Sequence, residues 1–315
     1  MSSVRAVAIS PAGLSSFFEI CDTGPGGEPL PDPELVGARG GGFALDLPIR
    51  TEVSVSEADQ TSVRVLINGS ETDAITTRAV VKRLLAETDG HYEIVVRHEI
   101  PVPIAAGFGT SGAGALTTAL ALSAALGLRL TYNELGRVAH VAEVECRTGL
   151  GTVAPLMVGG PCVITVEPGA PGRAVIDRIP VPRGLKIIAG VFGPIETRGV
   201  LVRSLGKPRI NAAGREALKR IMHDPCLETF MESCRLFAIE SGLATRRTVE
   251  LMDALADVGV LCAQNMIGEA VHAVARDEEE LERALAVFKR FLEPSKIYVA
   301  NVSWSGAQLI SVGGD

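Results

Sequence analysis

Hydrophobic and polar residues alternate, or form short apolar runs, at several places in the first half of the chain. Such runs predict β-strands, here over residues 4–9, 52–56, 62–67 and 92–100. Between the last two, apolar residues from Ile75 to Leu85 recur at helical spacing. This spacing predicts a helix over residues 73–88.

Two further helices are predicted in the middle of the chain, over residues 110–126 and 132–146. The second is preceded by Thr131 and carries Glu134 three residues later. This spacing is a capping box, in which each side chain satisfies a backbone donor at the start of the helix. The sequence therefore predicts that this helix begins after Thr131.

The second half mixes strands with a long helical stretch. A mostly helical region is predicted over residues 210–291, and the proline- and glycine-rich segment 167–173 is expected to be a turn or an interlobe linker. The strands expected in this half are residues 162–166, 174–179, 185–191, 296–302 and 307–311. Strands that come first and helices that come later favour an α+β fold.

Composition and charge restrict the kinds of molecule that the protein is expected to bind. With 315 residues, 47% of them hydrophobic, the chain can bury a substantial core. A net charge of -7 offers no basic field for nucleic acid or an anionic membrane, so small molecules or other proteins are the expected partners. The apolar run 115–128 is shorter than the roughly 20 residues that span a bilayer.

The cysteines and the N-terminal residues predict the cellular location of the protein. The six cysteines are scattered without a C-x-x-C pair or a zinc-like spacing, which is typical of reduced thiols in a cytoplasmic protein. The first ten residues lack an uninterrupted apolar stretch, so no secretory signal is expected. A cytoplasmic location is therefore predicted.

The segment 104–116, IAAGFGTSGAGAL, contains the spacing G-x-G-x-x-G, but it does not fit the two common nucleotide-binding motifs. A dinucleotide fold needs a central strand just before the glycines, where Pro101 and Pro103 each remove a backbone donor. A P-loop needs Lys and Ser or Thr where this chain has Ala115 and Leu116.

A phosphate cradle of another kind remains. Four glycines within eight residues, Gly107, Gly109, Gly112 and Gly114, surround the start of the predicted helix at residue 110. Unpaired backbone amides and the positive end of the helix dipole attract a phosphate there, and no side chain blocks its approach. A glycine-rich helix start that serves only close packing is the alternative.

Residues 103–116, PIAAGFGTSGAGAL, resemble the second motif of the GHMP kinases, P-x-x-x-G-L-G-S-S-A-A, with Thr110 and Ser111 in place of the serine pair. Four other segments make the whole chain similar to the archaeal-type pantoate kinases within that superfamily. They are SPAGLSSFFEI (10–20), GARGGGFAL (37–45), AHVAEVECRTGLGTVAP (139–155) and QNMIGEAVHAV (264–274).

The resemblance implies both a fold and an activity. The fold is the α+β GHMP kinase fold, with an N-terminal lobe like ribosomal protein S5 domain 2 over residues 1–166 and a ferredoxin-like C-terminal lobe over 174–315. The activity is ATP-dependent phosphorylation of pantoate to 4-phosphopantoate in coenzyme A biosynthesis. ATP, Mg²⁺ and pantoate are the implied ligands, and a homodimer is expected.

The resemblance also assigns roles to residues of the glycine-rich segment 103–116, the phosphate loop, and to residues of the predicted helix 132–146 and the segment after it. Ser111 and Glu143 are expected to bind Mg²⁺ and, with Thr152, to form the catalytic group. Thr152 stands where related kinases often carry an Asp, and Thr cannot act as a general base. The residues expected to bind ATP are Pro103, Ala106, Gly107, Gly109, Thr110, Ser111, Gly112, Ala113 and Gly114.

Pantoate carries a carboxylate, which calls for a local cation. Arg39 and Arg147 lie beside glycines and can grip a carboxylate with two hydrogen bonds; Arg198 is a weaker candidate. Ser15, Ser16 and Thr148 are expected to contribute hydroxyl contacts. His140, three residues before Glu143, is expected to be a packed residue rather than a catalyst.

Two departures keep other functions open. Gly13 stands where pantoate kinases are expected to carry His, and Thr152 replaces the expected Asp. A kinase for another hydroxy acid, such as homoserine or a mevalonate derivative, is one alternative. A nucleotide-binding relative with weakened or lost catalysis is the other.

Overall fold

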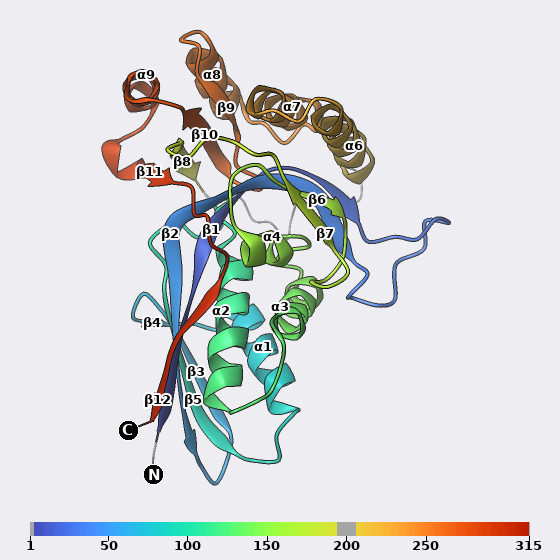
Figure 1. The fold of residues 1–315 in the computed structure, drawn as a ribbon, viewed down its shortest axis with the longest axis vertical. Helices are drawn as coiled ribbons and strands as arrows, with labels where there is room; N and C mark the ends of the chain where they lie inside the picture. The colour runs from blue at the N-terminus through green and yellow to red at the C-terminus, as the bar shows by residue number, and fades with distance from the viewer. Residues whose placement is uncertain (1–2, 194–205, 315) are drawn as a thin grey trace.

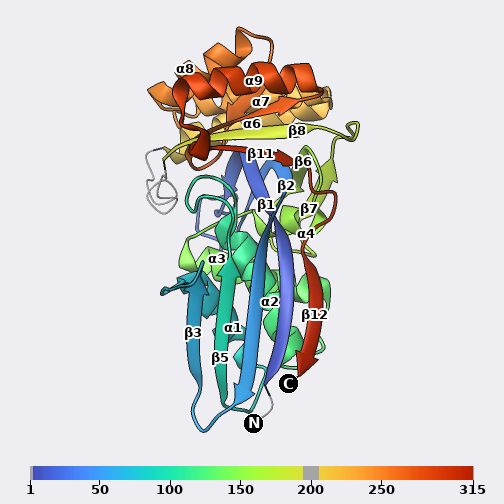
Figure 2. The ribbon, with the colours of Figure 1, turned by 90° about the vertical axis from the view of Figure 1, so that its left-hand side faces the viewer.

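Two β-sheets organise the chain in a computed structural model that describes residues 3–193 and 206–314 (Figures 1 and 2). The first sheet has eight strands, in the order β12-β1-β2-β5-β3-β4, with β6 paired to β2 and β7 paired to β6. Its strands are β1 (Val4–Cys21), β2 (Gly37–Glu57), β3 (Ser62–Ile67), β4 (Ser70–Glu71), β5 (Tyr92–Glu99), β6 (Val163–Glu167), β7 (Val175–Arg178) and β12 (Gln308–Gly314).

The strands β1 and β2 are much longer than the sequence predicted. The predicted strand 4–9 is only the first third of β1, which continues to Cys21 through two irregular pairings, one after Ser10 and one after Ser15. Glycines in β2 permit this close pairing, since a Cβ on Gly42 would overlap the carbonyl oxygen of Leu14. The irregular pairings and glycines break the alternation from which a strand is recognised.

Three helices, α1 (Ile75–Leu85), α2 (Thr110–Ala125) and α3 (Tyr132–Cys146), cover one face of the first sheet (Figure 1). All three were predicted to within a few residues. The capping box at the start of α3 is confirmed, because Thr131 accepts from the backbone of Glu134 and Glu134 accepts from that of Thr131. In the described part of the chain, no helix combines the length and apolar character needed to cross a membrane.

The second sheet is antiparallel, in the order β11-β8-β10-β9, and four helices lie with it at the end of the molecule opposite the chain termini (Figure 2). The first of these helices also packs against β1 of the first sheet. The strands are β8 (Lys186–Gly193), β9 (Leu261–Gln264), β10 (Glu269–Ala275) and β11 (Ile297–Asn301). The helices are α6 (Lys207–His223), α7 (Leu227–Glu240), α8 (Arg246–Ala256) and α9 (Glu278–Phe291), with a 3₁₀ turn at Pro294–Lys296.

The prediction of a mostly helical region over residues 210–291 was wrong for β9 and β10. Residues 270–275 of β10 are all buried, so the strand lacks the alternation of a half-exposed strand. A short run that is apolar on both faces has the same sequence pattern as a buried helical segment. The hairpin formed by β9 and β10 was therefore not recognised.

Residues 167–173 form a turn rather than a connection between sheets. They join β6 to β7, which pair as an antiparallel hairpin. The strands β7 and β12 follow residue 174 but belong to the first sheet. The division into lobes at residues 1–166 and 174–315 stays a prediction.

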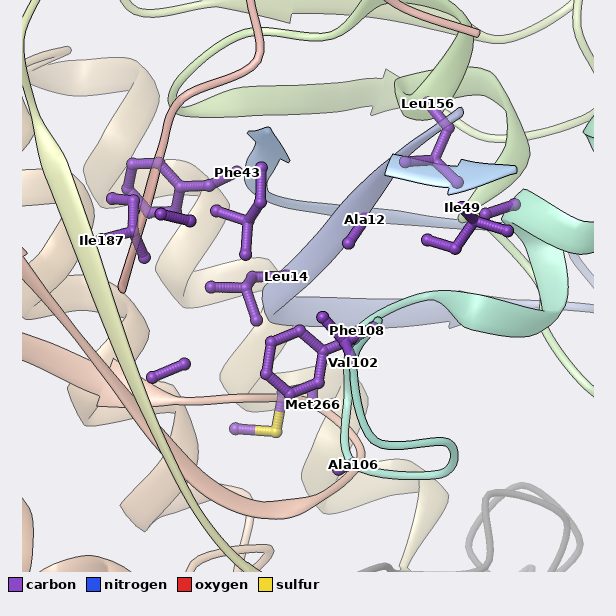
Figure 3. Packing of buried hydrophobic residues seen from close by; sticks show 14 of the residues in the cluster. Ala12, Leu14, Phe43, Ile49, Val102, Ala106, Phe108, Leu156, Ile187 and Met266 are labelled. Atoms are coloured by element: carbon purple, nitrogen blue, oxygen red, sulfur yellow. The ribbon is translucent and has the colours of Figure 1, made fainter. Parts of the chain in front are cut away.

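One apolar core continues from the first sheet into the second. Figure 3 shows Phe108, from the loop before α2, next to Met266, from the β9–β10 turn, with Leu14 of β1 nearby. Phe108 also meets Tyr298 of β11 edge to face, with ring centroids 5.7 Å apart. The glycine-rich loop is therefore held by residues of both sheets.

A buried histidine ties the first sheet to its helices. Nδ1 of His98 (β5) lies 2.7 Å from the hydroxyl of Thr51 (β2), and Nε2 lies 3.0 Å from that of Thr77 (α1). The Thr51 hydroxyl is also 2.5 Å from that of Thr117 (α2). Burial lowers the pKa of His98 from 6.5 to about 4, so this histidine is neutral in the folded protein at neutral pH.

Replacing His98 by Gln is expected to weaken the dependence of stability on pH. Because the pKa of His98 is lower in the folded state, its contribution is complete above pH 6.5 and is lost as the pH falls toward about 4. One such group adds a slope of up to about 1.4 kcal/mol per pH unit to the unfolding free energy. Urea unfolding at pH 7, 6 and 5 measures this slope; equal slopes in both proteins would contradict the assignment.

Candidate active site

The glycine-rich loop presents free backbone amides at the start of α2. Gly107 and Gly109 have φ angles of 80° and 62°, in the left-handed region that favours glycine. Gly109 is the N-cap residue and supplies no capping side chain. Within residues 3–193 and 206–314, the backbone N–H groups from 107 to 112 donate to no acceptor. This helix start is therefore suited to bind an anion.

The loop borders a cavity of about 620 Å³ that also touches β1, β2, α1 and the segment after α3. Most of the predicted site residues line it: Ser15, Arg39, Gly107, Gly109, Thr110, Ser111, Gly112, Gly114, Glu143, Arg147, Thr148 and Thr152. The predicted residues that do not line it are Ser16, Pro103, Ala106 and Ala113.

Three of these four residues are buried elsewhere. Ala106 and Ala113 pack in the apolar core. The hydroxyl of Ser16 lies 3.1 Å from Nε2 of His272. Pro103, the fourth, is partly buried. Arg198, the weaker arginine candidate, falls outside the described residues. The sequence pattern could not reveal these placements, because neighbouring residues of a loop or strand point in different directions.

Glu143 is at the centre of a cluster of hydroxyl groups. Its side chain on α3 is only 2% exposed, and Oε1 accepts from Ser111 (2.5 Å) and Thr148 (2.7 Å). The hydroxyl of Thr76, in the first turn of α1, lies 3.0 Å from that of Thr148 and 3.4 Å from that of Ser111. Burial raises the pKa of Glu143, whereas the two hydrogen bonds oppose this rise.

Ser111 and Glu143 are suited to bind Mg²⁺. Both offer hard oxygen atoms, and Mg²⁺ in kinases is commonly held by one or two carboxylates together with substrate phosphates. In the described parts of the chain, no group of three or more His, Cys, Asp or Glu side chains is arranged to hold a metal ion. These two residues would therefore hold Mg²⁺ together with phosphate oxygens rather than in an all-protein cage.

Glycines keep room around this carboxylate. A Cβ on Gly112 would lie 3.0 Å from Oε2 of Glu143, and a Cβ on Gly149 would overlap that oxygen. Thr152 lies against the phosphate loop, where its Cγ2 would be 2.9 Å from a Cβ on Gly109. Its hydroxyl does not cap the short helix α4 (Val153–Val158) that follows it.

The position at which pantoate kinases were expected to carry His is sterically narrow. The backbone N–H of Gly13 donates to the carbonyl of Phe108 at 3.0 Å. A Cβ on Gly13 would lie 3.0 Å from Cδ2 of Leu156. A histidine there requires the Leu156 side chain to move. Glycine at position 13 therefore fits the packing around it.

The two arginines of the cavity differ in their partners. Arg39 is occupied: it donates to the carbonyl of Val166 at 3.1 Å and pairs with Glu19 and Glu167, each at 3.3 Å. Arg147 is exposed and sits at the C-cap of α3 with a left-handed φ of 56°. Its guanidinium forms no ion pair or hydrogen bond with any residue that the structure describes.

Apolar residues form another part of the cavity lining. Ile75 and Ile104 line the cavity with 45% and 50% of their surfaces exposed. Ile67 and Ile100 also contribute. An exposed apolar surface of this kind suits the flat face of a nucleotide base. No sequence pattern indicated this role, because isoleucines at such spacing are typical of a hydrophobic core.

His140 is packed away from the cavity, as expected. It is 1% exposed, and its Nε2 lies 2.8 Å from the carbonyl of Val36. Burial lowers its pKa. It takes no part in the cavity lining.

Comparisons with known proteins agree with this fold. The family model described as GHMP kinases N terminal domain matches residues 75–160, which include the phosphate loop and Glu143. The fold and the loop therefore define a GHMP-type, ATP-dependent kinase.

Relatives extend the match over nearly the whole chain. A pantoate kinase of Thermococcus kodakarensis is 32% identical over 253 residues, covering 79% of this chain and 82% of that protein. A pantoate kinase of Methanocaldococcus jannaschii is 27% identical over 281 residues, covering 89% and 96%. The chain belongs to the GHMP kinase superfamily.

Solved structures have the same architecture. A structure described as a phosphotransferase related to the CoA biosynthesis pathway matches with a TM-score of 0.85 at 27% identity, over 99% of this chain and 98% of that one. Mevalonate diphosphate decarboxylase from Staphylococcus aureus matches with a TM-score of 0.74 at 13% identity, over 98% of both chains. At 13% identity, the similarity to the decarboxylase shows a shared fold and nothing further.

Proposed function

We propose that this protein transfers a phosphoryl group from ATP to the hydroxyl of pantoate, giving 4-phosphopantoate for coenzyme A biosynthesis. The near-full-length similarity to pantoate kinases, at 27% and 32% identity, carries the proposal. The cavity supports it, because it combines a helix start without a capping side chain, an apolar surface and Arg147, which pairs with no residue that the structure describes.

The proposed mechanism depends on position and charge. The amides from 107 to 112 bind the triphosphate, and the base lies against Ile75 and Ile104. Ser111 and Glu143 would hold Mg²⁺, which neutralises phosphate charge. Phosphoryl transfer has a loose transition state and takes most of its acceleration from positioning and electrostatics. A Thr at position 152 is therefore compatible with turnover.

Arg147 is proposed to bind the carboxylate of pantoate, since Arg39 already pairs with Glu19 and Glu167. Replacing Arg147 by Met is expected to raise KM for pantoate by about 10- to 100-fold, the value of a hydrogen bond to a charged group. KM for ATP is expected to stay unchanged. Steady-state kinetics with each substrate varied in turn measures both constants.

The matched control for this variant is Arg83→Met. Arg83 pairs with Glu145 and does not line the cavity. If Arg147→Met and Arg83→Met give the same KM for pantoate, Arg147 does not bind the acceptor.

The acceptor is tested by ADP release over a panel of hydroxy acids. Pantoate, homoserine and mevalonate are each supplied with ATP and Mg²⁺, and the product with pantoate is identified by its phosphorus-31 spectrum. The proposal expects the highest kcat/KM with pantoate. Turnover with another acid alone would reject pantoate and favour a different GHMP-type kinase.

A catalytically weakened relative is the second candidate, favoured by Thr152 in place of the Asp that related kinases often carry. Calorimetry decides this case: binding of ATP with Mg²⁺ without turnover of any acceptor would support it. The expected homodimer is a separate proposal, which light scattering in solution tests.

A further inference from the structure

A buried chain of three polar side chains joins the two sheets behind the phosphate loop. Oγ of Ser16 on β1 lies 3.1 Å from Nε2 of His272 on β10, and Nδ1 of His272 lies 2.9 Å from Oδ1 of Asn265. All three residues are fully buried. Burial lowers the pKa of His272 to about 3, so its ring is neutral, with one donor and one acceptor nitrogen.

Asn265 retains a hydrogen-bonding group without a partner. Its side-chain nitrogen is buried and finds no acceptor among the residues that the structure describes. Turning the amide over would exchange its nitrogen and oxygen but still leave one of them unpaired. A buried, unpaired polar atom opposes folding, so its presence at this place needs an explanation.

Asn265 belongs to the turn, residues 265–268, that backs the phosphate loop. A Cβ on Gly107 would lie 2.8 Å from Cβ of Asn265, and a Cβ on Gly268 would lie 2.6 Å from the carbonyl oxygen of Ala106. The next residue, Met266, donates its backbone N–H to Ser15 at 2.7 Å, and Figure 3 shows its side chain next to Phe108. The turn and the loop are therefore in direct backbone contact.

Peptide geometry connects this contact to anion binding. The N–H and C=O of a trans peptide unit point in opposite directions. An N–H of Gly107 that turns into the cavity toward a phosphate therefore turns the carbonyl of Ala106 away from the cavity, to the side where Asn265 and Gly268 contact the loop. A hydrogen-bond donor on that side stabilises the loop in its anion-binding conformation.

We propose that Asn265 is a positioning residue for the nucleotide, whose unpaired side-chain amide receives a backbone carbonyl of the phosphate loop when the triphosphate is bound. His272 and Ser16 fix the orientation of that amide. The inference rests on the proposed ATP-dependent kinase function. Because Asn265 acts on the loop and not on the acceptor, its loss affects nucleotide affinity selectively.

Two variants test this role. Asn265→Leu keeps the branching of the side chain without hydrogen bonds, and Asn265→Asp keeps an acceptor for His272 but loses the amide donor. The matched control is Asn211→Leu, since the Asn211 side chain bonds both backbone groups of Ile20, at 2.8 and 2.9 Å, away from the cavity. KM values for ATP and pantoate are measured, with the thermal shift produced by ATP and Mg²⁺ alone.

Both Asn265 variants are expected to raise KM for ATP about tenfold, the value of one hydrogen bond. They are also expected to reduce the thermal shift and to leave KM for pantoate unchanged. The control is expected to lower the melting temperature without changing KM for ATP. A KM for ATP equal to that of the wild type in both variants, or failure of both to fold, would overturn the positioning role.

The thermal shift separates this inference from the proposed function. If the wild-type protein phosphorylates no acceptor, the proposed function fails. The comparison of ATP-induced shifts between the wild type and the Asn265 variants still decides whether Asn265 supports nucleotide binding. Equal shifts would reject its role.

Discussion

Replacing Glu143 by Gln is expected to lower kcat by about 10²- to 10³-fold, the usual cost of one group that stabilises developing charge. Gln keeps the size of the side chain and an oxygen that can accept from Ser111 or Thr148. It removes the negative charge that would hold Mg²⁺. The concentration of Mg²⁺ needed for half-maximal activity is therefore expected to rise as well.

The Glu143→Gln variant is expected to be as stable as the wild type or more stable, although its activity falls. A buried carboxylate lowers stability, as the raised pKa of Glu143 indicates, so the Gln protein is expected to melt at or above the temperature of the wild type. Steady-state kinetics at several Mg²⁺ concentrations and a melting curve measure both effects. An unchanged kcat, with the same Mg²⁺ dependence, would remove Glu143 from the catalytic group.

The local patterns of the sequence predicted the parts of the fold that depend on neighbouring residues. The capping box of Thr131 and Glu134 located the start of α3, and the density of glycines located the loop that leads into α2. Helical periodicity found α1, which buries one face, whereas α2 is buried on nearly all sides and carries no such periodicity. The strand β10 was not recognised, because burial on both faces removes the alternation that marks a strand.

The candidate site was predicted less completely, because it depends on contacts between distant segments. Ser111 and Glu143, 32 positions apart, were expected to act together and are hydrogen-bonded. No pattern indicated that Thr76 would join them from α1. Arg39 was expected to be free for a substrate, but Glu19 and Glu167 pair with it from other strands. Such pairing is set by tertiary structure and has no local signature.

Gly149→Ala is expected to reduce kcat/KM about 100-fold although it removes no polar group of the site. A Cβ on Gly149 would overlap Oε2 of Glu143 and lie 3.0 Å from its Cδ, so the carboxylate must move. A displacement of about 1 Å of a positioned group can cost about 10² in rate. The φ angle of Gly149 lies outside the left-handed region, so an alanine there introduces no backbone strain of its own.

The control for this variant is Gly313→Ala on β12, where an added Cβ meets no atom within 4 Å and activity should be unchanged. A double variant then identifies the cause of the loss. If Gly149→Ala acts by displacing the Glu143 carboxylate, it should cost little once Glu143 is Gln, because both changes remove the same interaction. Kinetic losses that simply multiply in the double variant would mean that Gly149 acts independently of Glu143.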